Sequence, residues 1–349
     1  MKKITITAAA LILAAVIAMP AFAAGDWNFY GSARISTFVK DIDNKPGVRD
    51  TKNLEQALQG NARIGATVKA SDGVTGCFEY GASDGNANVR KLYGQWDFGS
   101  GTLLIGQDYT PMNFFYSNQV YDTDDGLGTY GGVATPRKPM IQLSFGNFKI
   151  AAISPETDTL NVANADTETT IPKIEASFTH KFDNAFVDAA AGYNTYSVTD
   201  TATGIENDIT SYVLAIGGGI TFDRYYINAD VFMGQNIGPY GLFNAPDNDP
   251  VVSGNTVIDN DVFGYLLVFG AKINDMFSIE AGYGYTEAEL DSTSAREDGA
   301  ESYYIQSTIT LAPGVFLVPE IGIRDNKTDK TGADESDIVY YGAKWQINF

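Results

Sequence analysis

Hydrophobic and polar residues alternate with a period of two along most of the chain. In the first such segment Trp27, Phe29 and Ile35 fall on one face, whereas Asn28 and Arg34 fall on the other. Successive side chains of a β-strand point to opposite faces of a sheet. The pattern therefore predicts strands with one apolar face and one polar face.

Many of the alternating segments reach ten or more residues, the length that a tilted strand needs to cross a membrane, whereas globular strands average about five or six residues. Short turns such as Ser71-Asp72-Gly73 alternate with longer polar connections, as in outer-membrane barrels. An even number of strands brings both ends of a single chain to the periplasmic side. We count sixteen segments: 27–40, 58–69, 74–82, 88–98, 102–109, 139–145, 148–153, 171–182, 185–198, 209–222, 224–235, 261–273, 276–286, 302–311, 315–324 and 337–349.

These features predict an all-β fold, an antiparallel up-and-down transmembrane β-barrel of about 16 strands. A secreted β-sandwich also has alternating strands. Strand length and the aromatic residues near strand ends, such as Tyr341, Trp345 and Phe349 in the last segment, favour the membrane. A closed barrel also leaves no strand edge with unpaired backbone groups in lipid.

The first residues predict export from the cytoplasm. Lys2 and Lys3 precede an apolar run that extends to Met19, and the small-residue site Ala21-Phe22-Ala23 follows it. A basic start, a short apolar run and a small-x-small site are typical of a secretory signal peptide. A retained anchor would need a spanning helix of about 20 residues. We therefore expect a cleaved signal peptide at 1–23 and one barrel domain at 24–349, in the outer membrane.

Composition supports a barrel and excludes several other classes of protein. The chain contains 20 Tyr, 20 Phe and 36 Gly, but only one Cys and one His, and its formal net charge is −20. Nucleic acid is therefore not an expected partner. The single Cys has no partner for a disulfide within the chain. The acids gather in segments that we expect to be solvated loops, which could alternatively share divalent cations with anionic lipid head groups.

The chain is not expected to be an enzyme. Acid-base or nucleophilic catalysis usually needs a His beside a nucleophile or an acid. The only candidate, His180, shares a strand face with Phe178 and Phe182 and is better explained as part of an interfacial aromatic girdle. No metal-ligand spacing, phosphate loop or dinucleotide fingerprint is present, so no cofactor is expected.

Two stretches resemble Gram-negative general porins, which are trimeric and sixteen-stranded. The segment from Val89 to Gln107, VRKLYGQWDFGSGTLLIGQ, resembles their fourth and fifth strands. The C-terminus resembles the signal that the barrel-assembly machinery reads on the last strand. Within that family, the chain resembles the homotrimeric porins of sulfate-reducing bacteria. The residues of this assembly signal are Tyr340, Gly342, Trp345, Ile347 and Phe349.

The resemblance implies a channel for passive diffusion of small hydrophilic solutes and ions. It also implies a homotrimer that packs through strands near the two termini and contacts outer-membrane lipid and lipopolysaccharide. The long connection at 108–138 corresponds to the third loop, which folds into the barrel in this family. Two departures concern the constriction: Gln107 stands where many relatives carry Arg, and Thr129-Tyr130-Gly131-Gly132 matches the family's acidic-aromatic-Gly-Gly run only in part.

Candidate constriction residues follow from alternation and from the resemblance together. Alternation turns Arg34 and Arg63 toward water, because a charge that faces lipid costs a few kcal/mol. Alternation also favours Lys91, whereas the resemblance favours Arg90. The resemblance places acids of the third loop opposite this basic wall, and Arg137 either joins the wall or anchors the loop. The full set is Arg34, Arg63, Arg90, Lys91, Asp122, Asp124, Asp125 and Arg137.

Two other kinds of barrel remain as alternatives. A solute-specific channel would present a ladder of Lys or aromatic residues, and a structural or adhesive barrel would have a filled lumen. Sixteen strands leave an aqueous channel, whereas small barrels pack side chains inside. Glu280, Glu320 and Arg324 also alternate inward, where we expect ordinary solvation. Screening over about 8 Å at physiological salt leaves the charges of the constriction, rather than the net charge, in control of ion selectivity, and we expect a mild preference for cations.

Overall fold

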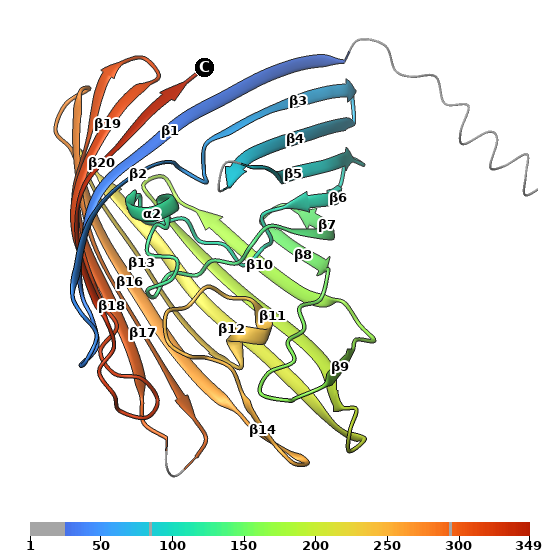
Figure 1. Ribbon diagram of the computed structural model, residues 1–349. Helices are drawn as coiled ribbons and strands as arrows, with labels where there is room; N and C mark the ends of the chain where they lie inside the picture. The colour runs from blue at the N-terminus through green and yellow to red at the C-terminus, as the bar shows by residue number, and fades with distance from the viewer. Residues whose placement is uncertain (1–24, 84–85, 293–294) are drawn as a thin grey trace, which may run out of the picture.

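One antiparallel sheet closes on itself to form the protein. The computed structural model describes residues 25–83, 86–292 and 295–349, so the predicted signal peptide lies outside the described residues. The sheet contains 18 strands and closes because the first strand, β1, pairs with the last, β20 (Figure 1). No helix in the described part of the chain is long and apolar enough to span a membrane.

The strands of the barrel follow one another in chain order. Their bounds are β1 (Asp26–Asp43), β2 (Thr51–Leu58), β3 (Arg63–Ser71), β4 (Val74–Ser83), β5 (Asn86–Asp97), β6 (Thr102–Asp108), β7 (Lys138–Phe145), β8 (Phe148–Ile153), β9 (Ala165–Glu168), β10 (Lys173–Lys181), β11 (Ala185–Asp200), β12 (Ile205–Phe222), β13 (Tyr225–Gln235), β16 (Asn260–Lys272), β17 (Phe277–Leu290), β18 (Asp298–Ala312), β19 (Val315–Asp325) and β20 (Asp337–Asn348).

Two of the barrel strands are interrupted, so the 18 strands make a barrel of sixteen. β2 and β3 both pair with β1, through Ile35 opposite Leu58 and Ser32 opposite Arg63. β9 and β10 both pair with β11 in the same way. The prediction of sixteen barrel strands is confirmed. The single strand predicted at 58–69 was wrong in its bounds, because the ladder breaks after Leu58, where the buried Gln59 side chain turns inward.

Alternation sorts the side chains as the sequence predicts. Trp27, Phe29, Trp345 and Phe349 are exposed on the outer wall, as expected for aromatic residues at a membrane interface. Phe38 is an exception, because it points inward and packs edge-on against Tyr121 and Tyr340. Within the predicted assembly signal Tyr340 is therefore buried in the lumen, while Trp345, Ile347 and Phe349 face outward.

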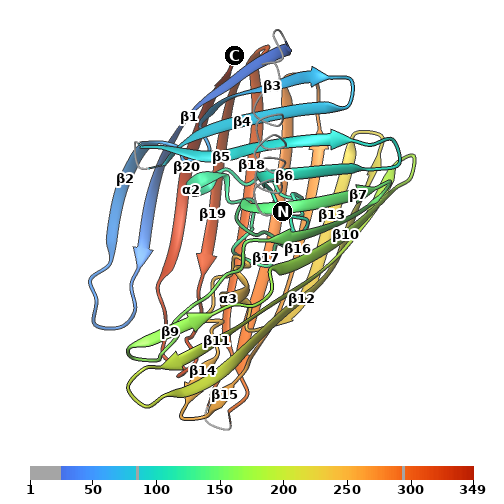
Figure 2. The same ribbon diagram turned by 90° about the vertical axis from the view of Figure 1, so that its right-hand side faces the viewer.

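The wall of the barrel differs in height around its circumference. β6, β7 and β8 have 7, 8 and 6 residues, whereas β11 and β12 have 16 and 18. β1 and β2 form a hairpin beside this short wall (Figure 2). Both described ends of the chain lie at the end of the barrel with the short turns (Figure 1).

Two loops fold into the barrel and bury an apolar core against its tall wall. The third loop, residues 109–137, contains the short helix α2 (Tyr121–Asp124) and connects β6 to β7. The sixth loop, residues 236–259, contains α3 (Ile237–Tyr240) and a small hairpin of β14 (Val251–Ser253) and β15 (Thr256–Ile258). The core includes Met112 and Leu127 of the third loop, Ile237 of the sixth, and Val213 and Leu266 of the wall.

Candidate functional site

Two of the cavities in the hollow of the barrel lie on either side of the third loop. An outer cavity of about 330 Å³ extends toward the long loops and is lined by residues such as Arg90, Arg137 and Phe243. An inner cavity of about 310 Å³ extends toward the short turns and is lined by residues such as Lys149 and Thr179. Both cavities are lined by the same four residues of the loop, which therefore mark the constriction between them: Tyr109, Asn113, Phe114 and Phe115.

Buried carboxylates of the wall hold the backbone of the third loop. Glu320 on β19 accepts hydrogen bonds from the amides of Val120 (2.7 Å) and Tyr121 (3.1 Å), one on each oxygen. Glu280 on β17 accepts one from the amide of Asn118 (2.7 Å). The sequence placed Glu280 and Glu320 in the lumen but assigned them to ordinary solvation. Instead they anchor the loop, and only the long-range contacts reveal this.

A third carboxylate holds both inward-folded loops at once. Glu175 on β10 accepts hydrogen bonds from the amide of Met112 (2.9 Å) and from the hydroxyl of Tyr240 (2.9 Å). Its partner Lys173 lies 3.0 Å away and donates to the carbonyl of Tyr240 (2.8 Å). Both members of this ion pair are buried, so the third and sixth loops share one buried polar anchor.

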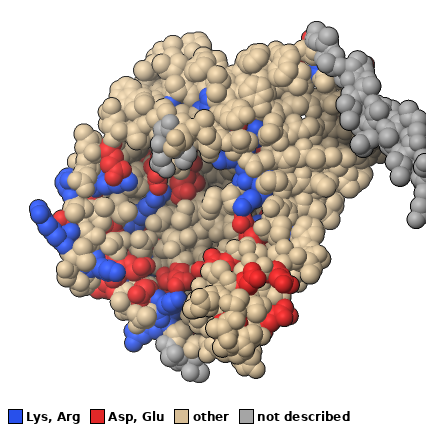
Figure 3. Space-filling model, turned by 45° about the vertical axis from the view of Figure 1, so that its right-hand side comes forward, with Lys and Arg blue, Asp and Glu red and all other residues tan. Residues whose placement is uncertain are grey.

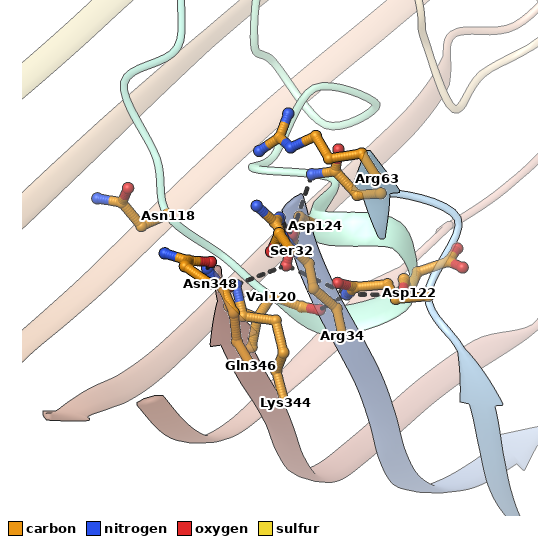
Figure 4. A network of polar contacts seen from close by, with 12 residues as sticks. Ser32, Arg34, Arg63, Asn118, Val120, Asp122, Asp124, Lys344, Gln346 and Asn348 are labelled. Carbon is orange, nitrogen blue, oxygen red and sulfur yellow. Dashed lines mark hydrogen bonds and ion pairs between the residues drawn. The ribbon is translucent and has the colours of Figure 1, made fainter. Parts of the chain in front are cut away.

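Ion pairs fix the acidic end of the third loop to β1, β19 and β20. Asp124 pairs with Arg34 and, at 3.0 Å, with Lys344 (Figure 4). Arg324 pairs with Asp125 at 3.1 Å and with Asp122 at 3.6 Å. Burial raises the pKa of Asp125, although the charge of Arg324 opposes this shift. Three acids thus meet three bases, and the end of the loop is locally neutral.

This arrangement differs from the one expected from the sequence. Asp122, Asp124 and Asp125 do not face Arg34 across an open passage. Arg34 instead contacts Asp124 directly and is buried. Asp124 and Asp125 do line the outer cavity, so a role in the pore remains a prediction for them.

Three arginines gather on the opposite side of the constriction. Arg90 and Arg63 share one carboxylate, Glu79, at 2.7 and 3.8 Å. Arg90 and Arg137 both donate hydrogen bonds to the Tyr109 hydroxyl, at 3.3 and 2.7 Å. Arg137 has no carboxylate within ion-pair distance among the described residues. Figure 3 shows both basic and acidic atoms in the hollow and around its rim, with the acidic atoms most abundant along the lower rim.

A β-bulge settles the orientation of Arg90 and Lys91. Glu79 on β4 pairs with Lys91, whereas the next residue, Tyr80, pairs with Val89, so that Arg90 is the additional residue. A bulge changes the alternation locally and re-aims a side chain. Both side chains consequently enter the lumen: Arg90 reaches Glu79, and Lys91 pairs with Asp108 at 2.8 Å.

The Gly131 position of the run Thr129-Tyr130-Gly131-Gly132 in the third loop requires a glycine for a physical reason. Gly131 has a φ of +84°, and a Cβ at this position would lie 2.0 Å from the carbonyl oxygen of Tyr265 and 2.6 Å from that of Tyr285. Only glycine tolerates both this backbone conformation and this approach. The loop therefore lies directly on the backbone of β16 and β17 at this point.

A family model described as Gram-negative porin matches residues 7–330, and the chain belongs to this family. No curated protein matches the chain by sequence. Among solved structures, the outer membrane channel DcaP of Acinetobacter baumannii is similar, with a TM-score of 0.76 and 17% identity over 94% of this chain and 98% of that one. An anion-selective porin from Comamonas acidovorans has a TM-score of 0.61 and 11% identity over 93% and 100%.

A trimer form of Vibrio cholerae OmpT has a TM-score of 0.59 and 18% identity over 93% of this chain and 99% of that one. These identities are low, so the structures establish the shared barrel fold. Family and fold together make the protein a channel of the Gram-negative outer membrane for passive diffusion of solutes. The resemblance to Gram-negative porins is confirmed, while the finer resemblance to those of sulfate-reducing bacteria stays a prediction.

Proposed function

We propose that this porin favours small anions, and that the constriction rather than the net charge determines the preference. Arg63, Arg90 and Arg137 meet a single carboxylate there, Glu79, which leaves two positive charges in excess. Lys91 and Asp108 balance each other. This arrangement favours the opposite sign to the mild cation preference expected in the sequence analysis.

The remaining acids do not cancel this excess. Charges of the external loops are screened over about 8 Å at physiological salt. Glu280 and Glu320 are buried, and amide groups of the third loop donate hydrogen bonds to both. The similar fold of an anion-selective porin from Comamonas acidovorans is consistent with this proposal.

We also propose that the channel is a homotrimer. A similar structure is described as a trimer form. In this chain, β2 pairs with β1 along one edge, and no strand within residues 25–83, 86–292 and 295–349 pairs with its other edge. A free strand edge is a ready site for contact with another chain, and unpaired backbone groups are costly in lipid. The interface would therefore include β1 and β2, near the N-terminus, as the sequence analysis expects.

The proposal includes no catalytic step. His180 lies on the outer wall between the rings of Phe178 and Phe182, whose centroids are 6.4 and 4.6 Å from its own. A histidine there does not face the lumen. The two cavities on either side of the constriction favour an open channel over a structural barrel with a filled lumen.

Single-channel recording of the purified protein in a planar bilayer with a KCl gradient tests both parts of the proposal. We expect large ohmic currents that close in three equal steps, with a reversal potential of the sign set by chloride. Closure in one step would contradict the trimer. A reversal potential at zero, or of the sign set by potassium, would contradict the anion preference.

A further inference from the structure

Two phenylalanines are exposed inside the lumen. Phe115 of the third loop is 65% exposed, and Phe243 of the sixth loop is 46% exposed. The lumen of a porin is generally polar, because its side chains face water. The neighbouring Phe114 is buried in the apolar core. The third loop therefore buries one phenylalanine ring and exposes the next, that of Phe115, to the lumen.

The exposed rings line the same cavity as the unbalanced arginines. Phe115, Phe243, Arg90 and Arg137 all line the outer cavity, and Phe115 also lines the inner one. The ring of Phe115 meets Tyr109 edge-on, with centroids 4.8 Å apart. The ring of Phe115 therefore lies where the outer and inner cavities meet.

The arginines are arranged to bind an anion beside the rings. Arg90 and Arg137 converge on the Tyr109 hydroxyl, and the Arg137 guanidinium lies 4.8 Å from the centre of the Tyr109 ring. These contacts hold both guanidinium groups in place. A guanidinium can bind a carboxylate through two parallel hydrogen bonds, and Arg137 has no carboxylate partner among the described residues.

From this arrangement we propose that the outer cavity is a binding site for small aromatic carboxylates. The carboxylate contacts Arg137 and Arg90, while the ring packs against Phe115 and Phe243. A cavity of about 330 Å³ is at the lower end of the range of roughly 300–1,000 Å³ that holds small organic ligands. Because the site includes the same arginines, the inference rests on the proposed anion preference and deepens it.

Binding at this site must be weak if it is to assist passage. A channel conducts best when a solute binds well enough to enter and loosely enough to leave. Phe115 of this site also lines the inner cavity, so the site adjoins both cavities, which suits a short residence. Benzoate has the required ring and carboxylate and is the probe of choice, while acetate has the same charge without the ring.

The test measures the block of KCl current by each probe in single-channel recordings of the whole protein. We expect benzoate to halve the current at a concentration about threefold to tenfold lower than acetate, the range that one good aromatic contact provides. Phe115→Ala and Phe243→Ala should each raise the half-blocking concentration of benzoate by about the same factor. Benzyl alcohol, which has the ring without the charge, should block more weakly than benzoate.

Phe316→Ala is the matched control, because Phe316 lines a different cavity on the turn side of the third loop. Benzoate should block this variant at the same half-blocking concentration as the wild type. Equal block by benzoate and acetate in the wild type would overturn the inference. So would an unchanged half-blocking concentration of benzoate in both Phe115→Ala and Phe243→Ala. The reversal potential of the wild type in KCl alone tests the anion preference separately.

Discussion

The double variant Glu280→Gln, Glu320→Gln should detach the third loop from the wall and turn steady currents into noisy ones. Both oxygens of Glu320 accept amide hydrogen bonds, at Val120 and Tyr121, and Glu280 accepts two from Asn118, one from its backbone amide and one from its side chain. A glutamine has only one acceptor oxygen and turns an NH₂ group toward these donors. A buried donor without an acceptor costs about 1–3 kcal/mol, so two such donors shift the loop toward the detached state by about 30-fold or more.

Single-channel recordings measure this effect as excess open-channel noise and altered conductance. Glu301→Gln is the matched control, because Glu301 lies on β18 between the two anchoring strands and accepts a hydrogen bond from Tyr283 rather than from the loop. Its currents should resemble those of the wild type. Steady wild-type currents in the double variant would show that the ion pairs of the loop suffice to hold it.

Glu175→Gln should have the largest effect on stability. It leaves Lys173, which is 1% exposed, without the charge of its partner. Removing one partner of a buried ion pair typically costs about 3–5 kcal/mol. The same carboxylate also accepts bonds from Met112 and Tyr240, so both inward-folded loops lose a contact.

Urea unfolding in detergent or lipid, followed by the shift of the folded band on gels, measures the free energy of unfolding for this variant. We expect it to decrease by about 3–5 kcal/mol. Glu206→Gln, an exposed position on β12, makes the same chemical change and should leave the unfolding midpoint unchanged. If the two variants unfolded at the same urea concentration, the buried pair would not be a structural anchor.

The barrel could be predicted from the sequence because alternation is a local property. Within each strand, the apolar side chains mainly face lipid and the polar side chains mainly face the lumen. In the first strand Trp27 and Phe29 are exposed on the outer wall, whereas Arg34 is buried in the lumen. Counting the alternating segments along the chain gives sixteen strands, which is an even number. The resemblance at 89–107 then added the family, which the family model confirms.

The site was harder to predict because it depends on contacts between distant segments. Nothing near Glu320 in the sequence indicates that it meets Val120, 200 residues away. The bulge at Arg90 shifts alternation by one residue, and sequence alone left Arg90 and Lys91 as alternatives. The break between β2 and β3 is equally non-local, because the Gln59 amide donates to carbonyl groups of the third loop, one of them that of Val120 at 3.0 Å.

Charge was the least predictable property from composition. The chain has a net charge of −20, yet the three acids of the third loop, Asp122, Asp124 and Asp125, are paired with bases of the wall. Which charges remain unbalanced depends on the pairing, and the pairing depends on the path of the third loop. A count of acids and bases therefore does not give the charge of the constriction.

The reversal potentials of the wild type and of the variant Arg63→Gln, Arg90→Gln, Arg137→Gln in the same KCl gradient show whether these arginines set the ion preference. The claim is that these three side chains, with Glu79, determine which ion passes. We predict a chloride-selective wild type and a shift toward potassium in the variant, where Glu79 remains without its basic partners. Identical reversal potentials for the two proteins would contradict the account.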